Sequence, residues 1–234
     1  MLPKHLHAQQ ETPEQEAEIR LKLIEMAARD AQVEDYDNMT HLALFGKLEI
    51  PFTLRQLNLR PTDVLLEGGC GTGRMTQIFA RKCKSIVAID FSIESLLSCR
   101  QKLDRLGIHN VDLIQADICA LPTHDEQFHK VVSCGVVEHV PTPESRAEMI
   151  AELARTALPG SKLVISAYKH SFYTRLFGKK EGEHSGGIYF LRFHHRELHT
   201  LLSTHLHVEL ISGLLVYYFT ARCAKPRHPR KHKA

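Results

Sequence analysis

The chain has 234 residues, of which 43% are hydrophobic, and a formal net charge of +3. This length and composition predict one packed globular domain and exclude a disordered chain. Five of the 30 lysines and arginines lie between Lys225 and Ala234, so the remaining 25 face 27 acidic residues. The main part of the chain is therefore slightly acidic, which excludes the strongly basic footprint of a nucleic-acid-binding domain.

The sequence gives no sign of a membrane span or of an oxidising compartment. The longest apolar run, Leu214 to Phe219, is far too short to cross a bilayer. The first 16 residues lack the apolar core of a signal peptide, and the six cysteines form no C-x-x-C pair. We therefore expect a cytoplasmic protein with reduced thiols.

Residues 1–58 predict a helical cap ahead of the main fold. Apolar residues recur at helical spacing from Pro13 to Asp30, and a second helical stretch runs from Leu42 to Leu57. Tyr36 lies in the connection between the two. Both helices precede the first predicted strand.

Residues 59–224 alternate between strand-like and helix-like runs, which predicts an α/β fold. Seven strands are expected, at residues 63–67, 85–89, 111–115, 129–134, 162–168, 205–211 and 214–222. Helices are expected at residues 74–82, 93–106, 143–158 and 195–203. This pattern predicts a Rossmann-like, doubly wound seven-stranded sheet with helices on both faces.

Two details of this region are also predicted. In the helix at 93–106 four leucines are expected to face the core, namely Leu96, Leu97, Leu103 and Leu106. Gly107 is expected to end that helix. Ser212-Gly213 predicts a tight turn between the last two strands.

The segment 169–192 breaks the alternation. It combines aromatic residues with Gly182, Gly186 and Gly187 and shows no regular period. Long irregular insertions in compact domains usually carry function, and the aromatic residues argue against disorder. We therefore expect a lid insertion at 169–192 that faces the substrate. The last segment, 225–234, is predicted to be a basic disordered tail.

A glycine-rich turn follows the first predicted strand, with the sequence Glu67-Gly68-Gly69-Cys70-Gly71-Thr72-Gly73. It departs from the dinucleotide fingerprint because Arg74 stands where the third glycine belongs. It lacks the Gly-Lys-Ser/Thr of a phosphate-binding loop. The pattern E-x-G-x-G-x-G resembles motif I of the class I S-adenosylmethionine-dependent methyltransferases.

Further pieces of that resemblance follow in order. Asp90 ends the second strand, Asp117 follows the third, Glu138-His139 follows the fourth, and Pro159-Gly160 precedes the fifth. The resemblance covers roughly residues 60–222. Two positions depart from the usual family pattern: His129 replaces an aspartate, and Ser161 replaces a second glycine after the Pro-Gly pair.

The resemblance implies S-adenosylmethionine as the cofactor and an antiparallel last strand. It implies that Asp90 binds the ribose hydroxyls and that Asp117 faces the adenine amino group. The implied cofactor-binding residues are Glu67, Gly68, Gly69, Gly71, Gly73, Asp90, Phe91, Asp117, Ile118 and Cys134. In such enzymes N-terminal helices cover the cofactor. For the predicted helix from Pro13 to Asp30, packing on the edge of the sheet is an equal alternative. Tyr36 is either a cover for the methionine end of the cofactor or an exposed turn residue.

Methyl transfer from a sulfonium needs alignment and exclusion of water more than it needs catalytic groups. His139 is the best candidate for a base, and Glu138 is a candidate for orienting it or for binding the acceptor. The alternative is that both residues form a plain turn into the next helix.

The reading that these observations favour is methyl transfer to a small-molecule acceptor. The segment Ser133-Cys134-Gly135-Val136 lacks the [DNS]-P-P-[YF] sequence typical of enzymes that methylate amino groups of bases. Two alternatives stay open: an RNA or tRNA methyltransferase that uses the basic tail, and a cofactor-binding subunit without activity of its own. The paired histidines at 195 and 199 and at 205 and 207 have no cysteine near them, and no H-E-x-x-H occurs, so no metal is expected.

Overall fold

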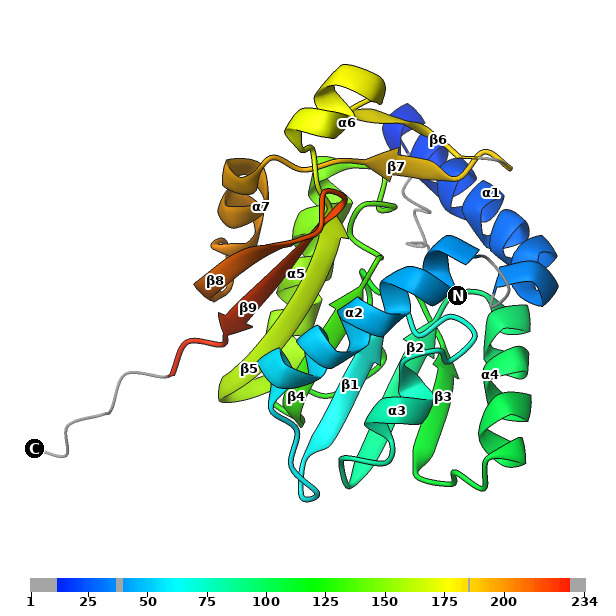
Figure 1. Ribbon diagram of the computed structural model, residues 1–234, viewed down its shortest axis with the longest axis vertical. Helices are drawn as coiled ribbons and strands as arrows, with labels where there is room; N and C mark the ends of the chain where they lie inside the picture. Colours follow the sequence, from blue (N-terminus) through cyan, green and yellow to red (C-terminus); the bar gives the residue numbers. More distant parts are fainter. Residues whose placement is uncertain (1–11, 37–39, 185, 228–234) are drawn as a thin grey trace, which may run out of the picture.

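The computed structural model describes residues 12–36, 40–184 and 186–227 and is built around a seven-stranded sheet (Figure 1). The strand order is β3-β2-β1-β4-β5-β9-β8. The strands are β1 (Val64–Gly68), β2 (Ser85–Asp90), β3 (Val111–Gln115), β4 (Phe128–Cys134), β5 (Ala157–Tyr168), β8 (His207–Leu214) and β9 (Tyr218–Ala224). The first five strands pair in parallel, and β9 is antiparallel to both of its neighbours. The predicted fold, including the antiparallel last strand, is confirmed.

Each face of the sheet carries its own hydrophobic core, because successive side chains of a strand point to opposite faces. Leu65 and Val132 pack on one face, against α2 (Thr40–Leu57), α3 (Thr76–Phe79) and α4 (Ile93–Arg105). Leu66 and Val131 pack on the other face, against α5 (Pro143–Thr156) and α7 (His195–Leu202). This is the doubly wound arrangement that the sequence predicts.

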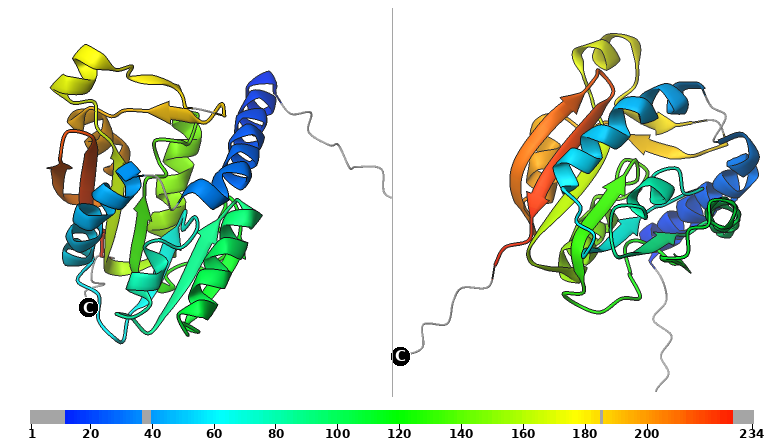
Figure 2. Two further views of the ribbon diagram at one scale, coloured as in Figure 1. Left: turned by 45° about the vertical axis from the view of Figure 1, so that its right-hand side comes forward. Right: turned by 60° about the horizontal axis from the view of Figure 1, so that its bottom comes forward.

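The helix α1 (Pro13–Tyr36) stands apart from these layers. It packs against α4, whereas α2 lies on the sheet against β4, β5 and β9 (Figure 2). The two helices of the predicted cap therefore pack against different parts of the domain. The helix continues six residues beyond the predicted end at Asp30, and the side chain of Tyr36 lies outside the described residues. None of the described helices combines the length and apolar character needed to cross a membrane.

Two predicted helices differ in detail. The helix expected at 74–82 is only the four residues of α3, and the amide of Asn110 donates to the carbonyl oxygens of Ala80, Cys83 and Lys84 where the chain turns toward β2. In α4, Leu96 and Leu103 are buried, but Leu97 and Leu106 are 49% and 42% exposed. Because adjacent helical residues point about 100° apart, Leu97 cannot share the inward direction of Leu96, and Leu106 lies past the last helical turn.

The last hairpin turns later than predicted. Ser212 and Gly213 pair with Thr220 and Phe219 inside the ladder between β8 and β9, so the turn falls at residues 215–217. The segment 169–192 is also more regular than predicted. It contains α6 (Phe172–Phe177) and a two-stranded sheet of β6 (Glu181–Glu183) and β7 (Tyr189–Leu191). Elements this short give too few repeats for a periodic signal.

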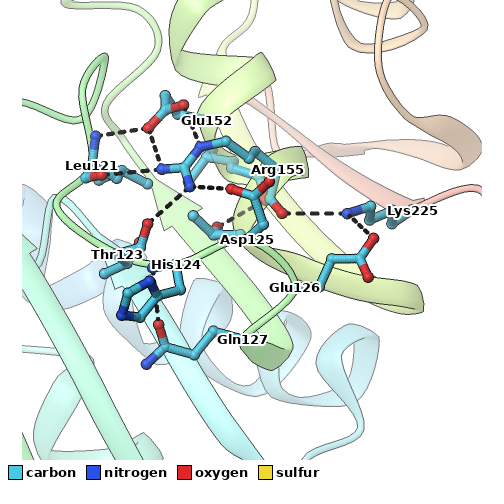
Figure 3. A network of polar contacts seen from close by, with 11 residues as sticks. Leu121, Thr123, His124, Asp125, Glu126, Gln127, Glu152, Arg155 and Lys225 are labelled. Carbon is cyan, nitrogen blue, oxygen red and sulfur yellow. Dashed lines mark hydrogen bonds and ion pairs between the residues drawn. The ribbon is translucent and has the colours of Figure 1, made fainter.

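A polar network ties the connection that precedes β4 to the end of α5, at the edge of the sheet where β4 begins (Figure 3). Arg155 donates to the carboxylates of Glu152 and Asp125 at 2.7 Å and to the carbonyl of Thr123 at 2.8 Å. Lys225 donates to Glu126 at 3.2 Å. The first residue of the predicted tail is therefore packed against the domain, and residues 228–234 lie outside the described residues.

Replacement of Gly73 by alanine should destabilise the fold more than replacement of Gly107. Both glycines have a left-handed φ, of +79° and +63°. A Cβ at Gly73 would also stand 2.4 Å from the sulfur of Cys99, whereas nothing lies within 4 Å of one at Gly107. We expect Gly107→Ala to cost about 1 kcal/mol and Gly73→Ala about 1–3 kcal/mol more, because overpacking is added to backbone strain. Urea unfolding of both variants measures the difference; equal losses would contradict the packing argument.

Candidate active site

A cavity of about 330 Å³ opens at the carboxyl ends of β1, β2 and β4. From β1 the chain moves outward to β2 and β3 and then returns to β4 on the other side of β1. In open α/β sheets such a reversal of strand order leaves a crevice in which ligands bind. The walls are the segments that follow these strands, together with one face of α1.

The glycine-rich turn is held by the neighbouring strand. The backbone N–H groups of Gly69 and Cys70 both donate to the carbonyl oxygen of Ile89, at 2.7 and 3.0 Å. The next N–H, of Gly71, donates to the Asp90 carboxylate at 2.7 Å. A Cβ added at Gly71 would meet nothing within 4 Å, so the loop presents open backbone to the cavity.

Asp90 is buried and lines the cavity. Its Oδ2 accepts from Gly71, and its Oδ1 accepts from the N–H of Ser92 at 3.0 Å. Burial raises the pKa of Asp90, whereas these two hydrogen bonds act in the opposite direction. A carboxylate offers about four lone-pair sites, so Asp90 keeps the capacity to accept from two ligand hydroxyls.

Glu67 is the deepest acid of the site. Its side chain is buried, and within the described part of the chain its Oε2 has no hydrogen-bond partner. Burial raises the pKa of this carboxyl to about 8. A buried acceptor without a partner is costly, so this position favours a ligand that brings a cation or a donor.

The helix α1 covers the cavity. Its lining residues follow one helical face and include Lys22, Glu25, Met26 and Arg29. Arg29 donates to Glu25 at 3.2 Å, and burial nevertheless raises the pKa of Glu25 to about 7. The sequence analysis missed these residues. The available signal was the spacing of Lys22, Glu25 and Arg29, which places three charged side chains on one helical face beside apolar ones.

Polar contacts hold α1 at both ends of the cavity. Glu18 accepts from Ser145 at 2.5 Å and from Thr142 at 3.2 Å, and Thr142 is the N-cap of α5. Asp30 accepts at 2.5 Å from Ser92, the N-cap of α4. Acidic side chains are favoured near helix N-termini. The helix therefore bridges the starts of α4 and α5 and spans the cavity between them.

Asp117 forms a further contact with α1. Lys22 donates to its Oδ2 at 2.9 Å, and the N–H of Cys119 donates to its Oδ1. Burial alone would raise the pKa of Asp117, but the hydrogen bond from Lys22 holds that pKa below its usual value. The acid that the resemblance places opposite adenine thus lines the cavity and also carries a contact that closes it.

His139 is buried at the wall of the cavity, and its Nδ1 lies 2.7 Å from the carbonyl oxygen of Tyr189. A carbonyl only accepts, so Nδ1 carries the proton and Nε2 is the acceptor nitrogen. Burial and the nearby Arg29 guanidinium lower the pKa of His139 to about 3. The side chain is therefore a neutral imidazole of defined tautomer at pH 7.

Glu138 does not line the cavity. It is fully buried, and both carboxyl oxygens lack a hydrogen-bond partner among the described residues. Burial raises the pKa of Glu138 to about 8, so the acid is mostly protonated at neutral pH. The two catalytic candidates are neighbours in the chain but occupy different environments.

Most of the predicted site residues come together. Those that line the cavity are Glu67, Gly69, Gly71, Asp90, Phe91, Asp117, Ile118, Cys134 and His139. Gly68, Gly73 and Glu138 lie outside its lining, and a Cβ at Gly68 would stand 2.6 Å from Ile118. Among the described residues, no three His, Cys, Asp or Glu side chains gather as a metal site requires.

The insertion supports the site from outside the cavity. None of its described residues is part of the lining. Its contacts with the segment after β4 include the hydrogen bond between the Tyr189 carbonyl and His139 and a second from the N–H of Leu191 to the carbonyl oxygen of Glu138. The ring of His184 also lies beside that of His139, with centroids 6.0 Å apart. The cover of this cavity is therefore α1 rather than the insertion.

The buried acids predict that stability falls as pH rises from 6.5 to 8. The pKa values of Glu25, Glu67 and Glu138 are all raised by burial, so the folded state binds more protons than the unfolded state in this range. His139 has the opposite effect, which is large below its ordinary pKa of 6.5 and fades toward the upper end of this range. Urea midpoints across this range should decrease. Glu138→Gln should flatten the slope, and Glu148→Gln, an exposed control, should not; a rising midpoint would contradict the assignment.

Comparison with known proteins agrees with this site. A family model described as a methyltransferase domain matches residues 65–160. A phosphatidylethanolamine N-methyltransferase of Cereibacter sphaeroides is 36% identical over 125 residues, which are 52% of this chain and 59% of the relative. A ubiquinone biosynthesis O-methyltransferase of Azoarcus sp. (strain BH72) is 32% identical over 114 residues, 48% of this chain and 47% of the relative. The chain thus matches only about half the length of these relatives. Other relatives of similar coverage on this chain are named for protein and tRNA methylation.

The fold has known counterparts as well. The structure of the N-methyltransferase NodS of Bradyrhizobium japonicum WM9, in complex with S-adenosyl-L-homocysteine, superposes with a TM-score of 0.69. It is 18% identical, and the match covers 87% of this chain and all of NodS. The structural match shows the fold, and the family model shows a methyltransferase domain over residues 65–160, which include the glycine-rich turn, Asp90 and Asp117.

Proposed function

We propose that this protein transfers a methyl group from S-adenosylmethionine to a small, largely apolar acceptor. The observation that carries the proposal is the cavity at the ends of β1, β2 and β4, where Asp90 and Glu67 face open space beside the glycine-rich turn. Apolar side chains, including Met75, Ile89 and Val136, make up much of the remaining wall. Such a mixture suits a ligand with polar ends and a flat apolar middle.

The residues fit the cofactor of the family. Asp90 would accept from the ribose hydroxyls, and Gly71 leaves room for the ligand to approach the backbone. Glu67, whose buried Oε2 lacks a hydrogen-bond partner among the described residues, would face the cationic amino-acid portion. Ile118 and Asp117 would border the adenine. When bound, the cofactor supplies an electrophilic methyl group on a sulfonium.

His139 would orient the acceptor. Its Nδ1 proton is committed to the Tyr189 carbonyl, so Nε2 can accept a hydrogen bond from a hydroxyl or amine. A pKa near 3 makes this imidazole a weak proton acceptor in the ligand-free protein. Its contribution would therefore be alignment of the attacking atom, with full proton transfer only if a bound anionic acceptor raises its pKa.

An apolar acceptor is supported by two observations. The relatives named above act, by their names, in phospholipid and ubiquinone metabolism. In addition, the apolar wall of the cavity includes Val136 and Val140, which follow β4, and Leu23 of α1. A labelled-methyl assay on cell extract divided into lipids, water-soluble metabolites, RNA and protein tests the class. Label in the lipid fraction supports the proposal, and label only in RNA or protein overturns it.

Asp90→Ala should weaken the binding of S-adenosylmethionine by about ten- to a hundredfold, since hydrogen bonds to a charged group are worth roughly 1.5–3 kcal/mol. Titration calorimetry with S-adenosylmethionine, S-adenosylhomocysteine and NAD measures this. Asp112→Ala, an exposed aspartate outside the cavity, should bind like the wild type. Binding of NAD in place of the adenosyl compounds would refute the proposed cofactor.

His139→Ala should lower kcat by about tenfold or more and leave cofactor affinity nearly unchanged, because the residue acts on the acceptor. His139→Asn keeps a donor toward the Tyr189 carbonyl but lacks Nε2. It therefore distinguishes alignment of the acceptor from packing of the side chain. Single-turnover rates with the labelled cofactor, together with calorimetry, report both quantities. Loss of cofactor binding in both variants would show that His139 has a structural role instead.

A further inference from the structure

The short helix α6 turns its apolar side toward solvent and its hydroxyl side chains toward the protein. Its polar residues Ser171 and Thr174 are buried, whereas its large apolar residues face solvent. Phe172 and Phe177 are 77% and 74% exposed, and Leu176 is 61% exposed. An ordered helix that hides its hydroxyls and exposes its phenyl rings marks a surface that binds something.

The orientation of α6 is set by hydrogen bonds. Ser171 caps the helix by accepting from the N–H of Thr174, and the hydroxyl of Thr174 donates to the carbonyl oxygen of Lys169 at 3.3 Å. The N–H of Gly178 closes the helix on the carbonyl of Thr174. These bonds attach the polar side of α6 to the end of β5, so the apolar side must point outward.

A second exposed segment continues this surface. In the turn between β8 and β9, Leu215, Val216 and Tyr217 are between 40% and 50% exposed. The rings of Tyr173 and Tyr217 meet edge to face with centroids 6.2 Å apart. Figure 1 shows α6 at the top of the molecule with the turn close beneath it. We call these seven residues the apolar ridge: Phe172, Tyr173, Leu176, Phe177, Leu215, Val216 and Tyr217.

Basic residues accompany the ridge. Between residues 169 and 197 there are six lysines and arginines against three glutamates, although the whole chain is close to balanced. Arg175 on α6 and Lys179 and Lys180 directly after it are exposed. Glu181 and Glu183 lie on β6, and Lys180 forms an ion pair with Glu197. The excess of positive charge therefore lies next to the exposed rings.

We propose that the apolar ridge docks on the surface of an anionic lipid bilayer. Exposed aromatic and leucine side chains enter the boundary between headgroups and acyl chains, and nearby cations attract anionic headgroups. A second copy of the chain is a poorer occupant. A two-fold contact through the ridge would place Arg175 and Lys179 near the same residues of the other copy and bring like charges together.

The ridge lies at the end of the sheet that carries the cavity. It follows β5, at the carboxyl ends of the parallel strands, and the same insertion holds His139 through Tyr189. Docking there would bring the cavity close to acceptors dissolved in the bilayer. The inference goes beyond the proposed reaction, and its test requires no methyl transfer.

The experiment is flotation of the full chain with vesicles of phosphatidylcholine alone and of phosphatidylcholine mixed with phosphatidylglycerol. The wild type should float with the mixed vesicles. Phe172→Ser/Phe177→Ser should reduce binding at least tenfold. The control is Leu97→Ser/Leu106→Ser, which removes two exposed apolar side chains from α4 and its C-cap and should bind like the wild type. Calorimetry with S-adenosylmethionine verifies that each variant is folded.

Charge is tested separately. Arg175→Gln/Lys179→Gln should weaken binding to the mixed vesicles severalfold, and added salt should weaken wild-type binding in the same direction. Three results would overturn the proposal. They are absence of wild-type binding to the mixed vesicles, binding that survives Phe172→Ser/Phe177→Ser, and a wild-type dimer that does not bind vesicles and that this variant converts to a monomer.

Discussion

The hydrogen bond from the Gly71 N–H to the Asp90 carboxylate fixes the geometry on which the site depends. It joins the turn after β1 to the end of β2 and does so with a buried acid. A buried carboxylate must be satisfied by donors, and backbone N–H groups can reach it only if the turn lies very close. The turn therefore cannot carry side chains toward Asp90. The same closeness leaves the backbone open toward the cavity. One hydrogen bond therefore both joins β1 to β2 and shapes the ligand site.

The sequence was sufficient to predict the sheet and the acids at the ends of its strands. Strands such as 85–90 are continuous apolar runs that end in an acid, and a parallel sheet buried on both faces produces that pattern. Glu67 and Asp90 end such runs, and Asp117 follows the more polar strand 111–115, so their meeting at one edge follows from topology.

The contribution of α1 could not be predicted in the same way. Its charged residues are typical of a solvent-exposed helix, and only the tertiary contacts of Lys22 with Asp117 and of Glu18 with Ser145 show which face is turned inward. Likewise, the aromatic residues of the insertion suggested a lid over the substrate. Hydrogen bonding of Thr174 instead orients α6 so that Phe172, Tyr173 and Phe177 are exposed. In both cases a few polar contacts outweigh the local pattern.

The strand order has a consequence for assembly of the domain. β9 lies between β5 and β8, although it follows β8 in the chain. Until β9 has formed, β5 has an unpaired edge and β8 has no neighbour in the sheet. During synthesis the incomplete domain therefore exposes the unpaired edge of β5, which must not pair with strands of other chains. Completion of the sheet depends on residues 218–224, and the contact of Lys225 with Glu126 then fastens the inserted strand to the loop that precedes β4.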